Sequence, residues 1–220
     1  MMLGRRDFFR AAGTTAVVGA VGVASAETAH AARPTLRQGS TGSQVKYLQA
    51  RLRKHGYWCR SVSGTYDDTT QQAVMAVQKA FGLPRDGVCG PKTWARIERL
   101  SRVRAKSSSG TLIEIDKRRQ LMIFVVSGKV TWVFNTSTGT SRTPTPSGRF
   151  RIFRQINGWR RSRLGLLYRP KYFNGGIALH GSKSIPGYPA SHGCCRLSNR
   201  ATDYIWWKNL APIGRRVWVY

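Results

Sequence analysis

Acidic residues are scarce in this chain of 220 residues: 9 Asp and Glu stand against 37 Lys and Arg, for a formal net charge of +28. From residue 105 onward the sequence contains three carboxylates, Glu114, Asp116 and Asp203. This shortage disfavours a hydrolase that uses paired carboxylates as acid and base. A strongly basic surface instead attracts polyanions, which include nucleic acids, anionic membranes and acidic cell-wall polymers.

Cysteines and long apolar runs are also few. The 4 cysteines form no Cys-x-x-Cys pair, which argues against a disulfide-built miniprotein, a zinc ribbon and a thioredoxin-like motif. The apolar run 11–26 has 16 residues and includes three glycines, so it falls short of the ~20 apolar residues that a membrane-spanning helix needs. Hydrophobic residues make up 41% of the chain, which is enough to build a folded core.

Residues 1–31 resemble a twin-arginine export signal. Arg5 and Arg6 precede the weakly apolar run, and Ala29-His30-Ala31 follows it as a small-x-small cleavage site. The alternative is a retained membrane anchor. Export implies that the mature chain works in the periplasm or outside the cell, associated with the wall, with no stable membrane span after cleavage. Wall anions are then better partners for the basic charge than nucleic acid.

Residues 36–100 have the pattern of a small helical domain. Apolar residues recur at helical spacing, and the predicted helices cover 43–52, 68–81 and about 91–100. Ser43 is the expected N-cap of the first helix, and Asp67 or Asp68 caps the second. Pro91 suits the first position of the third.

The order of these elements resembles the peptidoglycan-binding domain of the three-helix type. The motifs that carry the resemblance are Val45-x-x-Leu48-Gln49-x-x-Leu52, Gly64-x-Tyr66-Asp67, Asp86-Gly87-Val88-x-Gly90 and Thr93-Trp94. The resemblance implies a noncatalytic module that holds its partner domain on peptidoglycan; the alternative is a generic three-helix bundle. Cys59 and Cys89 both fall in its interhelical loops, where they form either a disulfide or two buried free thiols.

Residues 101–110 have the composition of a short flexible linker. Beyond it the periodicity changes from helical to strand-like. Strands are expected at 111–116, 120–126, 130–134, 149–156 and 216–220, with one helix from 198 or 199 to about 207. The sequence therefore predicts α and β structure in separate domains, the second being a mostly antiparallel β-sandwich over residues 111–220.

One cysteine of this β domain lies close to both of its histidines. His180 and His192 fall within 15 residues of Cys194. A thiolate is the reactive nucleophile, and a nearby imidazole both removes the thiol proton and stabilises the anion. Gly193 permits a tight turn whose backbone N–H groups point at a developing oxyanion. No carboxylate is at hand to orient the imidazole, so a backbone carbonyl is a candidate for that role.

This stretch resembles the L,D-transpeptidase catalytic domain, also called the YkuD domain. The match is His180-Gly181 followed by Ser191-His192-Gly193-Cys194-x-Arg196-Leu197, supported by Ser137-Thr138-Gly139, Thr145-Pro146-Ser147-Gly148 and Phe173-x-Gly175-Gly176-x-Ala178. The resemblance covers residues 111–220 and implies a β-sandwich with a cap over the active-site cleft.

The same resemblance implies roles for individual residues. Cys194 is the expected nucleophile, His180 the general base and acid, and the main chain of Gly181 the group that orients His180. The expected oxyanion region consists of His192, Gly193 and Cys194, and substrate contacts are expected from Arg196, Tyr168 in the cap, Gly176 and Ser191. No cofactor and no metal are needed.

Two features depart from the family pattern. The segment 181–190 between His180 and the Ser-His-Gly-Cys core contains Pro186 and Pro189, which suggests a shorter and stiffer loop. Cys195 occupies a place usually filled by an aliphatic residue. Because adjacent residues of an extended chain point to opposite faces, Cys195 is expected in the core; a redox partnership with Cys194 is the alternative.

The resemblance implies a peptidoglycan transpeptidase. Cys194 would take the acyl group of the position-three diamino acid from a donor stem tetrapeptide, release D-Ala, and pass the acyl group to a second stem as a 3→3 cross-link. Acylation by carbapenems is also expected, and the partners are stem peptides, glycan and anionic wall polymers. The alternatives are an L,D-carboxypeptidase, a zinc peptidase, a noncatalytic wall-binding protein and a nucleic-acid binder.

Overall fold

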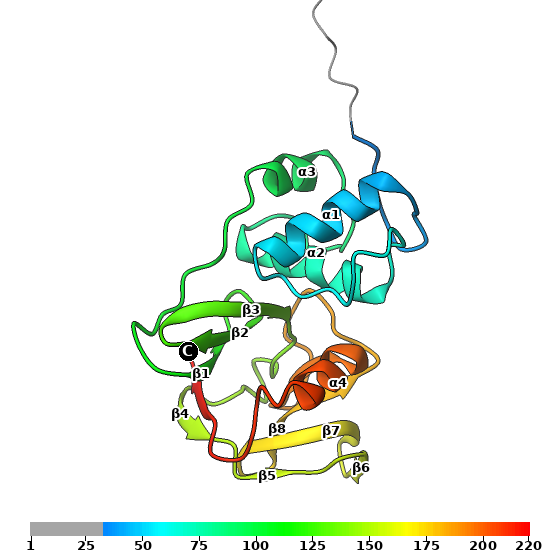
Figure 1. Ribbon diagram of the computed structural model, residues 1–220. Helices are drawn as coiled ribbons and strands as arrows, with labels where there is room; N and C mark the ends of the chain where they lie inside the picture. The colour runs from blue at the N-terminus through cyan, green and yellow to red at the C-terminus, as the bar shows by residue number, and fades with distance from the viewer. Residues whose placement is uncertain (1–32) are drawn as a thin grey trace, which may run out of the picture. The chain divides into compact units, whose positions relative to one another are not determined.

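The computed structural model describes residues 33–220, and the export signal expected at 1–31 lies outside them. Three helices come first: α1 (Ser43–Lys54), α2 (Asp68–Ala80) and α3 (Pro91–Glu98) (Figure 1). The strands that follow are β1 (Leu112–Asp116), β2 (Leu121–Val126), β3 (Lys129–Asn135), β4 (Gly148–Arg151), β5 (Arg154–Gln155), β6 (Trp159–Ser162), β7 (Gly165–Asn174), β8 (Ile177–Ser182) and β9 (Cys195–Ser198). Helix α4 (Asn199–Trp207) and strand β10 (Arg216–Val219) come last. Within the described range, no helix is both long and apolar enough to cross a membrane.

The helices of the first region lie where the sequence predicts them, with C-terminal ends that differ by one or two residues. Gly42 is the N-cap of α1 and makes no side-chain bond, so the prediction of Ser43 as the cap is wrong: Ser43 is the first helical residue. The Asp67 carboxylate caps α2 by accepting the Thr70 N–H at 2.8 Å. Pro91 opens α3 as predicted, but the helix ends at Glu98, before Leu100.

The second region is a β-sandwich of two sheets. One sheet has the order β3-β2-β1-β10-β4 and the other β5-β7-β8-β9, with β6 paired to β7. Every pairing is antiparallel except β1 with β10 and β8 with β9. Apolar side chains from both sheets and from α4 form the core between them, among them Ile113, Phe134, Leu179, Ile205 and Val217. The prediction of a mostly antiparallel sandwich is confirmed.

The strand expected at 149–156 is in fact two strands in different sheets. β4 pairs with β10, whereas β5 pairs with β7. The chain crosses between the sheets at Ile152 and Phe153, whose N–H groups donate to Arg215 O at 2.9 Å and Tyr172 O at 3.0 Å. Ile152 is buried and Phe153 is half exposed at this crossing. The prediction of one continuous strand is therefore wrong, because the alternation of side chains does not reveal a change of partner.

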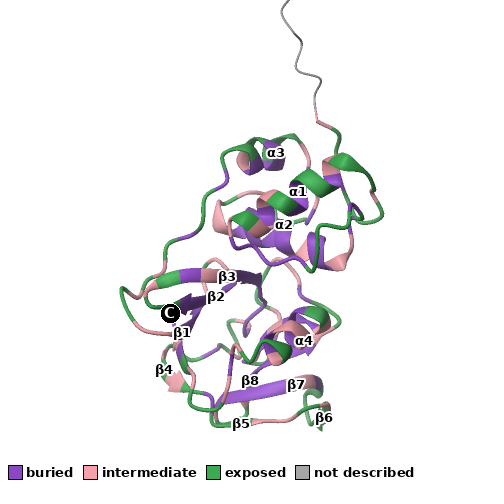
Figure 2. Cartoon of the chain, in the orientation of Figure 1, coloured by how far each residue is buried: buried purple, intermediate pink, exposed green. Residues whose placement is uncertain are grey.

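The helical region packs directly on the first sheet. Figure 2 shows the buried side of α2 facing β2 and β3, and one apolar cluster joins Val77 of α2 to Ile123 and Val133 of those strands. The main-chain N–H of Trp58 also donates to Val133 O at 3.1 Å. Within residues 101–110, Val103 is buried in the same cluster. The core of the helical region is thus continuous with one face of the sheet.

A buried lysine bonds the helical region to the loop that leads to Ser191. Lys79 on α2 is 1% exposed, and its Nζ donates to Thr136 O at 2.7 Å, Pro186 O at 3.3 Å and Gln120 O at 3.4 Å. Burial lowers the pKa of Lys79 to about 7, with a smaller contribution from the charge of Arg85. These bonds hold the carbonyl of Pro186 against α2.

Cys59 and Cys89 are free thiols, both fully buried. Burial raises the pKa of Cys59 to about 12 and raises the pKa of Cys89 as well. Of the two possibilities left open by the sequence, the structure has the buried thiols and not the disulfide.

Candidate active site

The parallel pairing of β8 with β9 brings the histidine and cysteine motifs together. Its register sets His180 opposite Arg196 and Leu179 opposite Cys195. Registered residues of parallel strands share a face, and side chains alternate along each strand. His180, Arg196 and Cys194 therefore fall on one face of the sheet. Cys195 falls on the other face, where it is fully buried in the core with Leu179, which confirms the expectation for this residue.

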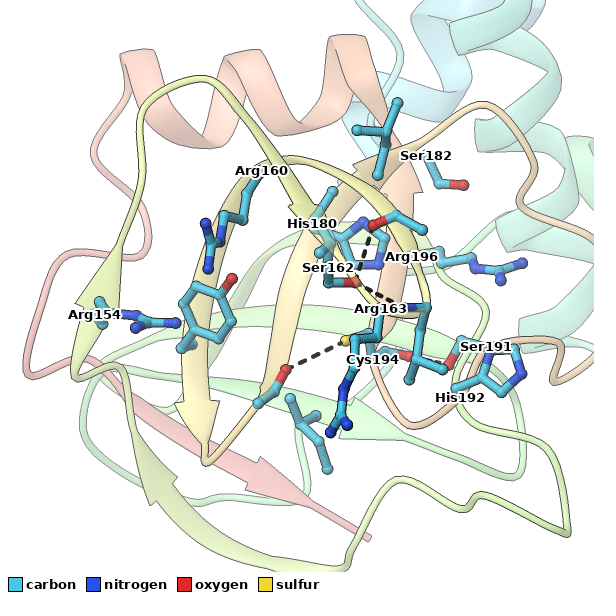
Figure 3. Close-up of a pocket in the computed structure, with 17 residues that line it drawn as sticks. Arg154, Arg160, Ser162, Arg163, His180, Ser182, Ser191, His192, Cys194 and Arg196 are labelled. Atoms are coloured by element: carbon cyan, nitrogen blue, oxygen red, sulfur yellow. Dashed lines mark hydrogen bonds between the residues drawn. The ribbon is translucent and has the colours of Figure 1, made fainter.

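His180 and Cys194 line the same cavity, which has a volume of about 530 Å³ (Figure 3). Its wall opposite the cysteine motif comes from β5, β6, β7 and the turn between β6 and β7. The lining residues are Arg154, Arg160, Ser162, Arg163, Leu164, Gly165, Leu166, Leu167, Tyr172, Gly176, Ile177, His180, Ser182, Ser191, His192, Cys194 and Arg196. All of them lie beyond residue 150, and only six of them were predicted as site residues from the sequence.

A backbone carbonyl orients His180, as the lack of a nearby carboxylate suggested. Nδ1 of His180 lies 2.8 Å from Gly181 O. A carbonyl oxygen can only accept, so Nδ1 carries the proton and Nε2 is left unprotonated. A Cβ on Gly181 would lie 2.5 Å from Asn199 Oδ1 and 2.8 Å from Tyr168 Cδ1, so this position has room only for glycine.

The imidazole of His180 is neutral near pH 7. Burial lowers its pKa to about 4; the charge of Arg196 acts in the same direction, and the bond to Gly181 O partly opposes both. The side chain is 6% exposed, so water does little to stabilise a charged ring.

Cys194 is a thiol in the same environment. Its Sγ accepts the Ala178 N–H at 3.4 Å and lies 3.9 Å from Gly176 O, the contact drawn in Figure 3. Burial raises the pKa of the Cys194 thiol, and the Ala178 N–H and the charge of Arg196 offset part of that effect. The resting site therefore holds a neutral thiol and a neutral imidazole, and attack by sulfur requires transfer of the proton as it occurs.

Two buried hydroxyl groups fix the turn before Cys194. Gly193 has φ +113°, a conformation that favours glycine. Ser191 Oγ donates to Cys194 O at 2.5 Å and accepts the Gly193 N–H at 3.1 Å. Thr145 Oγ1 donates to Gly193 O at 2.7 Å. The Thr-Pro-Ser-Gly motif already marked Thr145 in the sequence, but its bond to the turn was not predicted.

The remaining predicted residues are divided between the cavity and its surroundings. Gly176, Arg196 and the exposed His192 line the cavity, with His192 at its edge in Figure 3. Tyr168 is not a lining residue: its hydroxyl donates to the Asp203 carboxylate at 2.8 Å and its ring packs on Trp159. The structure thus brings Tyr168 against Gly181 and not into the cavity.

Sequence reasoning missed three arginines of the cavity wall, Arg154, Arg160 and Arg163. They fit no motif and lie among other arginines, such as Arg151 and Arg161, so in a chain with so many basic residues nothing separated them from solvated surface positions. Within residues 33–220, no three His, Cys, Asp or Glu side chains lie close enough to share a metal ion.

The fold and the cavity define a β-sandwich protein with a paired cysteine and histidine, attached to a three-helix domain. Residues 110–219 match the family of the L,D-transpeptidase catalytic domain, and residues 41–97 match the peptidoglycan binding domain family. The chain therefore belongs to the L,D-transpeptidase family, and both resemblances seen in the sequence are confirmed.

Individual relatives agree with this assignment. An L,D-transpeptidase from Xylanimonas cellulosilytica is 45% identical, with a TM-score of 0.81 over 86% of this chain and 98% of that one. The N-acetylmuramoyl-L-alanine amidase CwlL of Bacillus licheniformis is 40% identical over 34% of this chain and 21% of its own length. A spore cortex-lytic enzyme of Halalkalibacterium halodurans is 37% identical over 33% of this chain and 22% of its own length. The chain thus spans about a fifth of the length of these two curated relatives.

Proposed function

We propose that this protein is a peptidoglycan L,D-transpeptidase that forms 3→3 cross-links through a thioester on Cys194. The observation that carries the proposal is that Cys194, directly before β9, and His180, on the paired strand β8, line one cavity. Membership of the L,D-transpeptidase family supports it.

Acylation begins with a neutral pair. The sulfur of Cys194 attacks the carbonyl carbon of the position-three residue of the donor stem while its proton passes to Nε2 of His180. The tetrahedral intermediate collapses when the carbon–nitrogen bond to D-Ala breaks, and His180 returns the proton to the leaving amine. The products are free D-Ala and a thioester on Cys194.

Transfer reverses these roles. The side-chain amine of a second stem attacks the thioester carbonyl and gives a proton to His180. The carbon–sulfur bond then breaks, and the proton returns to the sulfur of Cys194. The energy of the original peptide bond is kept in the thioester, so no nucleotide is consumed.

The turn 191–194 is the proposed oxyanion region, with His192, Gly193 and Cys194 lining it. Its main chain is held in place by Ser191 and Thr145, so its dipoles need no rearrangement as charge develops. Arg196 adds a positive charge on the same face of the sheet. We assign Ser191 to support of this turn in addition to the substrate contact expected from the family.

The helical domain is proposed to hold the enzyme on the wall. The match of residues 41–97 to the peptidoglycan binding domain family supports this role. A net charge of +28 suits a matrix of anionic wall polymers. Residues 1–31, with their twin arginines, would deliver the protein to that matrix as an exported protein.

Intact-mass analysis after exposure to a stem tetrapeptide, and separately to a carbapenem, tests the proposal. We expect one adduct on the wild type and none on Cys194→Ser. Cys195→Ala is the control and should also form one adduct, because the thiol that it lacks is buried in the core. No adduct on the wild type with either compound would point to a noncatalytic wall-binding protein. Product analysis then separates the reactions: a cross-linked dimer indicates transfer, and a tripeptide alone indicates an L,D-carboxypeptidase.

A further inference from the structure

Four guanidinium groups surround the candidate active site. Arg154 on β5, Arg160 on β6 and Arg163 in the turn between β6 and β7 line the cavity with Arg196 of β9. In Figure 3, Arg154 and Arg160 lie on one side of Cys194, and Arg196 lies on the other. The cavity is therefore positively charged on both sides of the sulfur.

Within residues 33–220, none of these four arginines forms an ion pair with a carboxylate. None of the lining residues is Asp or Glu. The ion pairs within residues 33–220 use other basic residues, namely Arg33, Arg119, Arg169 and Arg200. The carboxylates beyond residue 105 are already bound: Glu114 by main-chain N–H groups and Tyr220, Asp116 by Arg119, and Asp203 by Tyr168 and Arg169.

The cavity wall formed by β5, β6, β7 and the turn between β6 and β7 also has apolar side chains beside its charges. Leu164 and Leu166 are 69% and 54% exposed, and both line the cavity. The guanidinium of Arg154 lies 4.1 Å from the centre of the Tyr172 ring, which holds it toward the same space. A wall of this kind fits a ligand that carries an anionic group on an aliphatic chain.

We propose that Arg160 and Arg163 form a carboxylate-binding site that makes the enzyme select stem peptides with a free carboxylate at position three over those with a carboxamide there. This inference rests on the proposed function, because it identifies which donor stems the cavity accepts. Arg196 is shared with the cysteine–histidine face and is not part of the selection.

The chemistry of the two groups accounts for the selection. Guanidinium forms paired, charge-assisted hydrogen bonds with a carboxylate, whereas a carboxamide is uncharged and presents one acceptor oxygen. Arg160 and Arg163 are exposed, so solvent and salt weaken each bond. Two such exposed contacts together should favour the carboxylate peptide about tenfold, which is equivalent to about 1.4 kcal/mol.

Acylation rates test the selection directly. Two synthetic tetrapeptides, identical except for a free carboxylate or a carboxamide on the position-three side chain, are compared by kcat/KM. We expect the wild type to favour the carboxylate about tenfold, and less as salt is raised. The double variant Arg160→Gln, Arg163→Gln should lose the preference by slowing only with the carboxylate peptide. Arg161→Gln is the matched control, because Arg161 lies between these two positions on the same hairpin but does not line the cavity.

A binding measurement separates this inference from the proposed reaction. The same peptides are titrated into Cys194→Ser protein, which keeps the arginines and cannot form a thioester. Preferential binding of the carboxylate peptide, lost in the double arginine variant, supports the site even if no turnover is found. Equal affinities for the two peptides, or a preference that remains in the double variant, overturn the inference. The proposed transpeptidation is unaffected by that result, because the adduct experiment tests it separately.

Discussion

The charge state of the cysteine and histidine pair gives a sharp prediction about pH. Burial lowers the pKa of His180 from 6.5 to about 4 and raises the pKa of Cys194 above 9.0. For His180, the difference corresponds to about 3 kcal/mol in favour of the neutral imidazole. Such a site depends on proton transfer during attack and holds no thiolate–imidazolium ion pair at rest.

The rate of acylation by a carbapenem should therefore stay constant down to about pH 5 and fall only as His180 protonates near pH 4. Independently, the thiolate absorbance of the wild type minus that of Cys194→Ser should stay at baseline at neutral pH and rise only in alkaline solution. Near-ultraviolet circular dichroism at each pH shows that the protein remains folded.

Arg196 provides a perturbation with a signed outcome. Its charge lowers the pKa of both His180 and Cys194. Arg196→Met should therefore move the acid limb of the rate and the onset of thiolate absorbance to higher pH together, while Arg196→Lys keeps both near their wild-type positions. A wild-type acid limb near pH 6.5, or a thiolate signal at neutral pH, refutes the neutral pair.

Two further predictions concern neighbouring groups. The pKa of Lys79 is about 7 in the folded protein, against an ordinary value of 10.5. Between these two pH values the unfolded chain binds more protons than the folded protein, so the free energy of unfolding rises with pH. Relative to Lys79→Met, the wild type should gain up to about 5 kcal/mol across this range. Urea unfolding of both proteins at pH 6, 8 and 10 measures the difference, and parallel curves contradict the prediction. Gly181→Ala should slow acylation about tenfold or more, because its Cβ would meet Asn199 Oδ1 at 2.5 Å and displace the carbonyl that orients His180. Gly90→Ala, with nothing within 4 Å, should leave the rate unchanged, and an equal loss in both variants would count against this explanation.

The spacing of apolar residues and the capping residues predicted the helices and the consecutive strands, because these elements depend on interactions between residues close in sequence. Helical spacing, the Asp67 cap and Pro91 identified the three helices to within a few residues. Alternating side chains identified β1, β2 and β3, which are consecutive and pair as neighbours. The cysteine and histidine motifs marked the candidate residues because few residue types perform such chemistry and each was rare in this chain.

Long-range pairing accounts for most of what the sequence did not show. Strand β6 is exposed throughout and polar except for Trp159, so its pairing with β7 left no alternation of apolar and polar residues to detect. The change of sheet at Ile152 depends on partners from distant segments. Arg154, Arg160 and Arg163 became recognisable as cavity residues only because strands β5 and β6 and the turn after β6 bring them to the cavity of Cys194. Tyr168, expected in that cavity, lies against Gly181 because it pairs with that residue across β7 and β8.

The parallel pair β8 and β9 raises a problem that the helical domain helps to solve. Parallel strands need a connection of about a dozen residues or more, usually a helix, but the connection 183–194 has no helix or strand of its own. Its carbonyls are bound from outside instead: Pro186 O by Lys79 and Gly187 O by Arg85 from the helical domain, and Tyr188 O by Ser137. Because Cys194 is the last residue of this connection, its position depends on residues of both regions. The helical domain therefore helps to position Cys194, in addition to its proposed role in wall binding.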